Sequence, residues 1–308
     1  MLSRPFTGVI AAPLLPMFDD GEIDWATLER YIDWIAGQNP AAIVMNVDAS
    51  EVIALDDAEQ LRIVEVCRAV IAGRVALLSG VVAGSTRVAA RKAQQLRDAG
   101  AQGFTVFPPF PTFSGSPVPA DMIVRFHRAI AQAAQLPIIC FQFPKGWGPD
   151  YTPEILQAMA EIPQLVAMKE ASFDVAQTLQ AIDVAHALAQ PIGVLTGSDT
   201  FIFEAMLMGC DGALIGFAAT ATAELVAMHD AVRRGDLAAG RAIWLRLGPI
   251  ARYCWRPPIR DFRPRMKEVL RLQGQFPSAA CREPQLGISA AEATEIARLC
   301  GAQGLTGN

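Results

Sequence analysis

The feature that most constrains the fold of this 308-residue chain is a regular alternation of short apolar runs with longer amphipathic runs. The short runs are apolar at nearly every position, which is typical of parallel strands buried on both faces. The longer runs repeat apolar residues at helical spacing, as Leu28, Ile32 and Ile35 do, and therefore predict helices that cover a sheet. The predicted strands cover residues 8–15, 41–46, 75–81, 102–107, 137–142, 164–169, 192–196 and 212–216. The predicted helices, the first with Asp24 as its N-cap, cover residues 24–38, 57–72, 85–99, 120–134, 152–161, 174–189, 199–208 and 222–234.

Eight strand–helix units within about 230 residues favour an α/β fold of the TIM (β/α)8 barrel type. An open, doubly wound sheet would more often carry a glycine-rich turn after its first strand, but this chain has PMFDDGE there. Three more helices are predicted at residues 237–253, 260–272 and 289–300. We therefore expect a barrel over residues 1–235 and a C-terminal helical extension, residues 236–308, packed on it.

Composition excludes several classes of protein. Hydrophobic residues make up 52% of the chain, which is enough for one large core, and the net charge of −5 argues against a nucleic-acid partner. The six cysteines have no CxxC spacing, so neither a zinc site nor a redox pair is predicted. No secretory signal or membrane-spanning run is visible, which predicts a cytoplasmic protein without a membrane partner.

One lysine stands out at the predicted catalytic end of the barrel, where the strands terminate. The chain has four lysines, and Lys92 and Lys267 lie in charge-rich helical segments that predict solvated side chains. Lys169 instead ends the buried run LVAMK. Burial lowers the pKa of a lysine, and the neutral amine can attack a ketone to form a Schiff base. The alternative is a structural lysine that snorkels or forms an ion pair, for example with Glu170.

The three histidines of the chain, His127, His186 and His229, all fall within predicted outer helices. This placement argues against a metal-dependent aldolase, which needs histidine or carboxylate clusters at the strand ends. We therefore expect no metal and no cofactor.

Five segments are similar to the motifs of a known family: GVIAAPLLPMFDDGEID, AAIVMNVDASEVIAL, ICFQFPKGWG, VAMKEAS and VLTGSD. They resemble, over residues 8–274, the dihydrodipicolinate synthase/N-acetylneuraminate lyase family of Schiff-base enzymes. The resemblance implies that Lys169 is the Schiff-base lysine and that Gly197, with its neighbours Ser198 and Asp199, lines the substrate pocket. It also implies a homo-oligomer, either a dimer or a tetramer.

The chain departs from the family pattern at the positions that handle protons and the carboxylate. Phe141 stands where the family has its proton-shuttling tyrosine, and Gly146 where an arginine is frequent. In the loop that corresponds to the family's GTTGE motif, Asp48 and Ala49 replace two threonines. The backbone N–H groups of Ala49 and Ser50 could still bind the carboxylate of a 2-oxo acid.

Asp48 is our candidate for the missing acid/base. Surrounded by Phe107, Phe141 and Phe143, its carboxyl group would have a raised pKa and could exchange protons near neutrality. The alternative is that Asp48 only caps the following turn. Lys145 could offset the negative charge of Asp48, although a solvated loop lysine is the simpler interpretation.

Two residue clusters bear on the substrate and on the assembly. The strand ends carry an aromatic set, which favours a substrate with fewer hydroxyl groups than a sugar acid: Phe107, Phe110, Phe113, Phe141, Phe143 and Trp147. The stretch 252–265 carries five arginines, for which ion pairs with barrel helices or neighbouring subunits are more plausible than nucleic-acid binding.

The predicted function is a Schiff-base-forming lyase, an aldolase or a dehydratase, that acts on a 2-oxo acid such as pyruvate or a pyruvate-derived aldol. Synthesis of dihydrodipicolinate itself is disfavoured because the tyrosine relay and the arginine are missing. The alternative function is that of a divergent, weakly active or inactive family member that binds a small oxo acid or another ligand.

Overall fold

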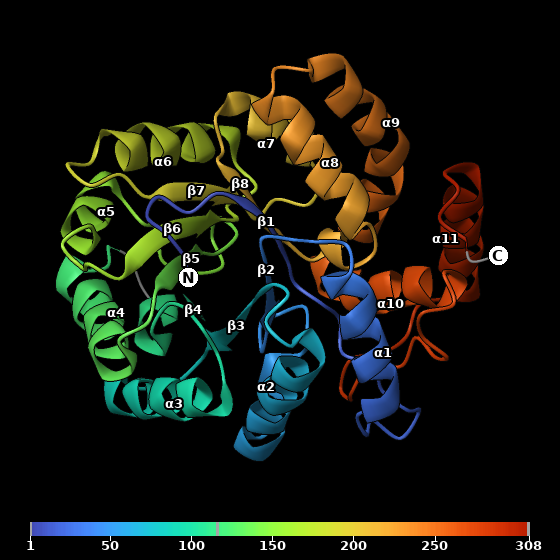
Figure 1. Ribbon diagram of the computed structural model, residues 1–308, viewed down its shortest axis with the longest axis horizontal. Coiled ribbons are helices and arrows are strands. Elements are labelled where there is room, and N and C mark those ends of the chain that lie inside the picture. The colour runs from blue at the N-terminus through green and yellow to red at the C-terminus, as the bar shows by residue number, and fades with distance from the viewer. Residues whose placement is uncertain (1, 115–116, 307–308) are drawn as a thin grey trace.

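A closed barrel of eight parallel strands forms the centre of the molecule (Figure 1). The computed structural model describes residues 2–114 and 117–306. Each strand pairs with its sequence neighbour, and pairing of Gly8 with Gly212 closes the ring between the first and last strands. The strands are β1 (Gly8–Ala11), β2 (Ala42–Met45), β3 (Ala76–Val81), β4 (Phe104–Val106), β5 (Ile138–Gln142), β6 (Leu165–Glu170), β7 (Gly193–Thr196) and β8 (Gly212–Ile215). The predicted barrel and strand order are confirmed.

The barrel helices begin where the sequence offers a side chain to their free N–H groups. Asp24 caps the first helix by accepting a hydrogen bond from the Thr27 N–H (3.0 Å), as predicted. Asp56 and Glu59 form a capping box on the second. The helices are α1 (Trp25–Ala36), α2 (Asp57–Ile71), α3 (Thr86–Ala99), α4 (Ala120–Ala134), α5 (Pro153–Met159), α6 (Val175–Ala187), α7 (Ile202–Met208) and α8 (Thr222–Arg233).

Helix α7 begins three residues later than predicted, at Ile202 rather than at residue 199. The reason is that the carboxylate of Asp199 does not cap this helix. It accepts a hydrogen bond from the N–H of Phe217, beyond the end of β8 (2.8 Å). Asp199 therefore belongs to the end of the barrel rather than to a helix.

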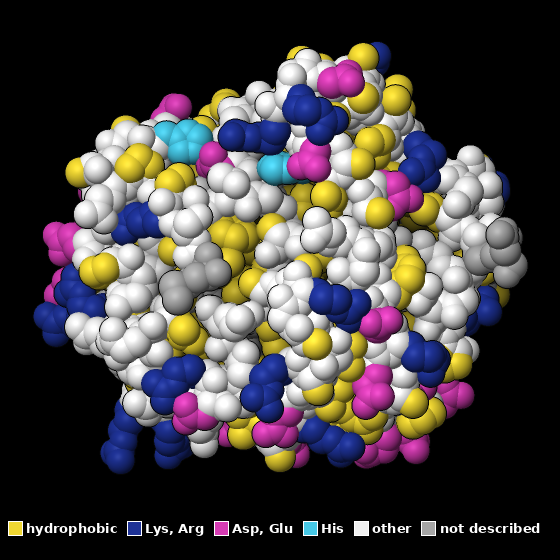
Figure 2. Space-filling model, in the orientation of Figure 1, with side chains coloured by type: hydrophobic (Ala, Val, Ile, Leu, Met, Phe, Trp, Pro, Cys, Tyr) yellow, Lys and Arg dark blue, Asp and Glu magenta, His cyan; other side chains and the backbone are white. Residues whose placement is uncertain are grey.

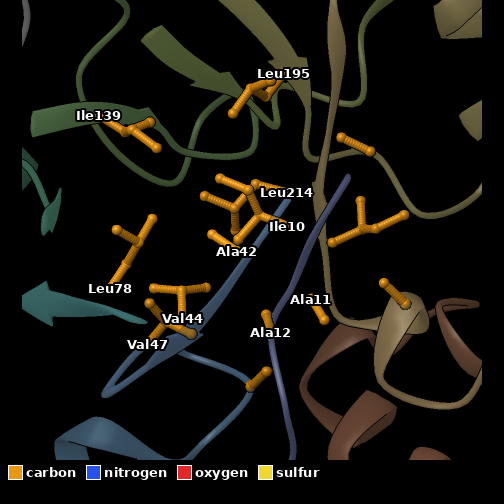
Figure 3. Packing of buried hydrophobic residues seen from close by; sticks show 14 of the residues in the cluster. Ile10, Ala11, Ala12, Ala42, Val44, Val47, Leu78, Ile139, Leu195 and Leu214 are labelled. Atoms are coloured by element: carbon orange, nitrogen blue, oxygen red, sulfur yellow. The ribbon is translucent and has the colours of Figure 1, made fainter. Parts of the chain in front are cut away.

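Apolar side chains fill the inside of the barrel, so a cavity can open only at an end. Figure 3 shows Ile10, Leu78, Ile139 and Leu195, from β1, β3, β5 and β7, directed toward one another. All four are at most 2% exposed. This layered filling is the normal core of the fold, and it gives the catalytic end a solid floor.

The C-terminal extension contains α9 (Leu237–Cys254), α10 (Phe262–Leu272) and α11 (Ala290–Ala302). In Figure 1, α10 lies beside α1, and α11 lies at the outer edge of the molecule. Arg265 is buried in this region and binds the carbonyl groups of Cys254 and Arg256 and the carboxylate of Glu292. This arginine of the basic stretch therefore stabilises the extension itself.

Three ion pairs join the extension to the segment that follows β2. Arg263 pairs with Asp48, Lys267 with Glu51, and Arg282 with Glu59. The Lys267 side chain is completely buried, with its ammonium bonded to Glu51 and to the carbonyl group of Ala280.

The prediction that Lys267 is solvated is therefore wrong, because its charge is matched by a partner 216 residues away in the sequence. Lys92, predicted to be solvated as well, is also mostly covered. It bonds to Gln60 and Asp57.

The outer surface mixes charges of both signs. On the face shown in Figure 2, Lys and Arg side chains alternate with Asp and Glu side chains around the rim. None of the helices in the described residues has both the length and the apolar character needed to span a membrane. Within these same residues, histidine, cysteine and carboxylate side chains form no group of three or more that could hold a metal ion.

Candidate active site

A cavity opens at the carboxyl ends of the strands. Residues from six strand ends and from the C-terminal extension line it, so the extension forms part of the wall. Apart from glycine and alanine, the lining residues are Val47, Asp48, Phe141, Phe143, Pro144, Trp147, Lys169, Phe173, Asp199, Trp255, Ile259, Arg260, Phe262 and Arg263.

Lys169 lies in this cavity beside the ring of Phe141. It occupies the fifth position of β6, in register with Phe141 on β5. Its Nζ lies 4.0 Å from the centroid of the Phe141 ring, a cation–π distance. The predicted lysine is therefore in the cavity, and a ketone carbon there can approach its amine.

The surroundings of Lys169 favour the neutral amine. Burial lowers the pKa of Lys169 from its ordinary value to about 8, while the negative charges of Asp199 and Asp48 act in the opposite direction. Glu170 is not its partner. The Glu170 carboxylate accepts hydrogen bonds from the Ser172 N–H (2.9 Å) and the Thr178 hydroxyl (2.6 Å). The structural alternative of a Lys169–Glu170 pair is therefore wrong.

Gly197 makes room for the Lys169 side chain. A Cβ atom at position 197 would lie 2.7 Å from Lys169 Cε and 2.7 Å from the Ala171 Cβ, closer than carbon atoms pack. Gly197 lines the cavity, as expected. Its neighbour Ser198 is fully buried and is not among the lining residues, so the expectation that Ser198 contacts substrate is not supported.

Asp199 is the most deeply buried carboxylate of the cavity, with only 3% of the residue exposed. Its Oδ1 accepts the hydrogen bond from Phe217, and no other described residue donates a hydrogen bond to Oδ2. Burial raises the pKa of Asp199 to about 7, against the lowering effects of the Phe217 N–H and the Lys169 charge. A proton carrier near neutrality thus lies in the same cavity as the lysine. The motif VLTGSD was the sequence signal for it.

Asp48 is placed differently from what the sequence suggested. It lines the cavity with Phe141 and Phe143, but its side chain is 47% exposed and pairs with Arg263. Arg263 also donates through Nε to the backbone carbonyl of Asp48 (2.7 Å). The expected enclosure of the Asp48 carboxyl group by phenylalanines is therefore wrong. Sequence reasoning missed Arg263, which follows Asp48 by 215 residues.

Of the two N–H groups proposed to bind a carboxylate, one is available. The Ser50 N–H donates to the carbonyl of Val47 (3.1 Å), and the Ser50 hydroxyl accepts from the Val47 N–H (3.0 Å). Ser50 therefore shapes the loop and is absent from the cavity lining. Ala49 lines the cavity, and its N–H makes no hydrogen bond to any described residue. Lys145 is an exposed loop lysine paired with Asp174 (3.0 Å), as the simpler interpretation had it.

The aromatic set forms a connected wall. Phe141 and Phe143 stack with ring centroids 4.6 Å apart, and the edge of Phe107 meets Phe141 at 4.9 Å. The extension adds a second stacked pair, Trp255 and Phe262, at 5.0 Å. Of the six predicted aromatic residues, Phe141, Phe143 and Trp147 line the cavity, whereas Phe107, Phe110 and Phe113 lie outside its lining. Rings of the extension that the prediction did not include line it as well.

Comparisons with known proteins decide the family. Residues 5–303 match the model of the Dihydrodipicolinate synthetase family. The chain belongs to this family. A similar protein is the 4-hydroxy-tetrahydrodipicolinate synthase of Gluconacetobacter diazotrophicus, 29% identical over 264 residues, 84% of this chain and 86% of the relative. The synthase of Pseudomonas aeruginosa is 28% identical over 243 residues, 79% and 81% of the two chains.

Solved structures agree on the fold. A monomeric dihydrodipicolinate synthase variant matches with a TM-score of 0.89 at 21% identity and covers 98% of both chains. A prophage protein of the same family from E. coli K12, in complex with pyruvate, matches with a TM-score of 0.88 at 23% identity, over 97% of this chain and 99% of the other. Family membership confirms the resemblance inferred from the motifs and the prediction of a Schiff-base lyase that uses a 2-oxo acid.

Proposed function

We propose that Lys169 is the residue that forms the Schiff base, through attack of its Nζ on the carbonyl carbon of a pyruvate-type 2-oxo acid. The observation that carries this proposal is a lysine with a pKa lowered to about 8 by burial, in the cavity at the strand ends, without an ion-pair partner among the described residues. Solved relatives of the same fold were obtained in complex with pyruvate, which supports the choice of acid.

The iminium formed at Lys169 withdraws electrons from the substrate. Attack expels the carbonyl oxygen as water and leaves a positive nitrogen bonded to C2. That nitrogen accepts the electron pair when a C3–H bond or the C3–C4 bond breaks, so the same intermediate serves a dehydratase or an aldolase. The ring of Phe141 faces this nitrogen and stabilises its charge without exchanging a proton.

The substrate carboxylate is bound on the β2 side. The free N–H of Ala49 points to one donor for it, and Arg263 neutralises the Asp48 charge that would otherwise repel it. The ion pair resolves a conflict in the sequence, where an aspartate occupies the expected carboxylate site.

Proton transfer requires a carboxyl group of the cavity, because the side chain of Phe141 has no ionisable proton. We assign it to Asp199, which is buried and has a pKa near neutrality. Asp48 remains the second candidate because it also lines the cavity and its charge acts on Lys169. Its ion pair with Arg263 makes it the less available of the two.

The oligomeric state and location of the protein are part of the proposal. A homo-oligomer, dimer or tetramer, is what the family resemblance implies. Light scattering across a concentration series tests it, and a monomer throughout would contradict it. We expect the protein to work in the cytoplasm.

Borohydride reduction in the presence of pyruvate tests the Schiff base. We expect a stable adduct, located on Lys169 by peptide mass spectrometry, and its loss in Lys169→Ala. Lys145→Ala is the matched control, since Lys145 is an exposed lysine paired with Asp174 outside the cavity, and it should keep the adduct. A folded protein that forms no adduct with any 2-oxo acid would favour the alternative of an inactive ligand-binding member.

A further inference from the structure

The side chains that line the cavity are mostly aromatic, aliphatic or charged, and few of them are neutral and polar. Six of its 19 lining residues are aromatic, and none is Ser, Thr, Tyr, Asn, Gln or His within the described parts of the chain. The side chains of the lining that can form hydrogen bonds are Asp48, Lys169, Asp199, Arg260 and Arg263, together with the indole N–H groups of Trp147 and Trp255. Sites that bind polyhydroxylated ligands need neutral donors and acceptors arranged along the ligand, and the only neutral polar groups among these lining side chains are the two indole N–H donors.

Most charged groups of the cavity already have a partner within the protein or a role in catalysis. Asp48 and Arg263 neutralise each other, Asp199 is anchored to the Phe217 N–H, and Lys169 is required for the Schiff base. Arg260 lies at the mouth with its side chain 72% exposed. A chain of hydroxyl groups reaching into this cavity would give up hydrogen bonds to water and find few replacements.

The aromatic residues offer a different kind of contact. One stacked pair, Phe141 and Phe143, comes from the region of β5, and the other, Trp255 and Phe262, comes from the C-terminal extension. Trp147 and Phe173 complete the rings of the lining. Flat rings of this kind pack against another ring edge-to-face or in offset stacks.

We propose that the aldehyde handled by this enzyme carries an aromatic or similarly apolar group rather than hydroxyl groups. The corresponding aldol is a 4-hydroxy-2-oxo acid with that group on C4. This inference rests on the proposed Schiff base at Lys169 and specifies the substrate class of the same site.

The reaction balances without any additional reactant. The aldol forms an iminium with Lys169 and releases water, and Asp199 removes the proton of the C4 hydroxyl. The C3–C4 bond breaks, its electron pair forms the enamine, and the apolar aldehyde leaves. Asp199 returns the proton to C3, and water then hydrolyses the iminium to pyruvate and free Lys169.

The test is a competition in the reverse direction. The wild-type protein is given pyruvate with benzaldehyde and with glyceraldehyde, and the initial rates of aldol formation are compared by chromatography with mass detection. We expect benzaldehyde to be favoured by kcat/KM by about 10–10²-fold, the range in which apolar pockets discriminate by polarity and size. Equal rates, or a preference for glyceraldehyde, would overturn the substrate class.

Two controls separate this inference from the function on which it rests. Borohydride trapping with pyruvate alone is run on the same sample. If the adduct forms but benzaldehyde is not preferred over glyceraldehyde, only the proposed substrate class is contradicted. If no adduct forms, the proposed function is contradicted. Phe143→Ala should raise the KM for benzaldehyde by a larger factor than the KM for pyruvate. Phe18→Ala, an exposed phenylalanine outside the cavity, should change neither, and equal behaviour of the two variants would count against the aromatic wall as the aldehyde site.

Discussion

On the β6–β7 side of the cavity the barrel itself positions Lys169 and Asp199, whereas on the β2 side Asp48 is positioned by Arg263 from the C-terminal extension. The motif resemblance predicts that the first side keeps the family's lysine and glycine, and that the second side lacks its threonines and the facing tyrosine. The difference indicates that covalent chemistry depends on the barrel framework. The carboxylate recognition that we propose depends on a contact between distant parts of the chain.

Replacing the two carboxylates one at a time should produce the largest difference between the two sides. Asp199→Asn is expected to lower kcat by about 10²–10⁴-fold, the usual contribution of general acid–base catalysis, while the pyruvate adduct still forms. Asp48→Asn should lower kcat much less. Steady-state kinetics with trapping as a folding control measures both, and the reverse order would assign the proton transfer to Asp48.

The buried ion pair between Lys267 and Glu51 holds the extension against the segment after β2, so breaking it should lower the stability of the whole fold. Lys267→Met leaves Glu51 as an unpaired buried charge, and we expect the free energy of unfolding to fall by about 3–5 kcal/mol. Urea unfolding followed by circular dichroism measures this loss. Lys92→Met is the control: its partner Asp57 is exposed, so a loss of only about 0–1 kcal/mol is expected, and similar losses in both would show that the buried pair has no special role.

On the barrel side, Gly197→Ala tests whether free space around Lys169 is essential. The added methyl group would displace the Lys169 side chain, and misplacing a reacting group by about 1 Å can lower a rate by about 10²-fold. The rate of borohydride-trapped adduct formation measures the effect. Gly84→Ala, with open space around its Cβ, should keep the wild-type rate, and an unchanged rate in Gly197→Ala would mean that Lys169 moves freely.

The smallest expected effect is on pH dependence. Because burial lowers the pKa of Lys169 to about 8, the neutral amine is lost as pH falls below this value, and the adduct rate should drop about tenfold per pH unit there. Asp48 and Asp199 each raise this pKa, Asp199 more strongly. Removing the Asp48 charge should therefore shift the profile slightly to lower pH and removing Asp199 should shift it further. A shift to higher pH in either variant would contradict this electrostatic picture.

Local sequence patterns correctly predicted the structural features that are determined by residues close together in the chain. The strand order, the N-cap at Asp24 and the position of Lys169 all follow from short runs whose periodicity reports burial directly. The aromatic mouth followed in the same way, since Phe141 and Phe143 lie on and just after one strand.

The remaining errors have a common cause. Lys267 lies in a charge-rich helix, and nothing nearby indicates that its partner is Glu51. The same holds for Arg263 and Asp48, and for Asp199, whose hydrogen bond to Phe217 delays the start of α7. These contacts form only when the extension or the next strand closes on the barrel, so a pattern read along the chain does not contain them.

The three ion pairs between the extension and the segment after β2 also have a consequence for biosynthesis. A nascent chain emerges from the ribosome N-terminus first, so Asp48, Glu51 and Glu59 appear long before Arg263, Lys267 and Arg282. Until those last residues are translated, the growing polypeptide carries Lys169 but its segment after β2 lacks all three partners. Catalytic competence should therefore arise only near the end of translation, when the extension can close on the barrel.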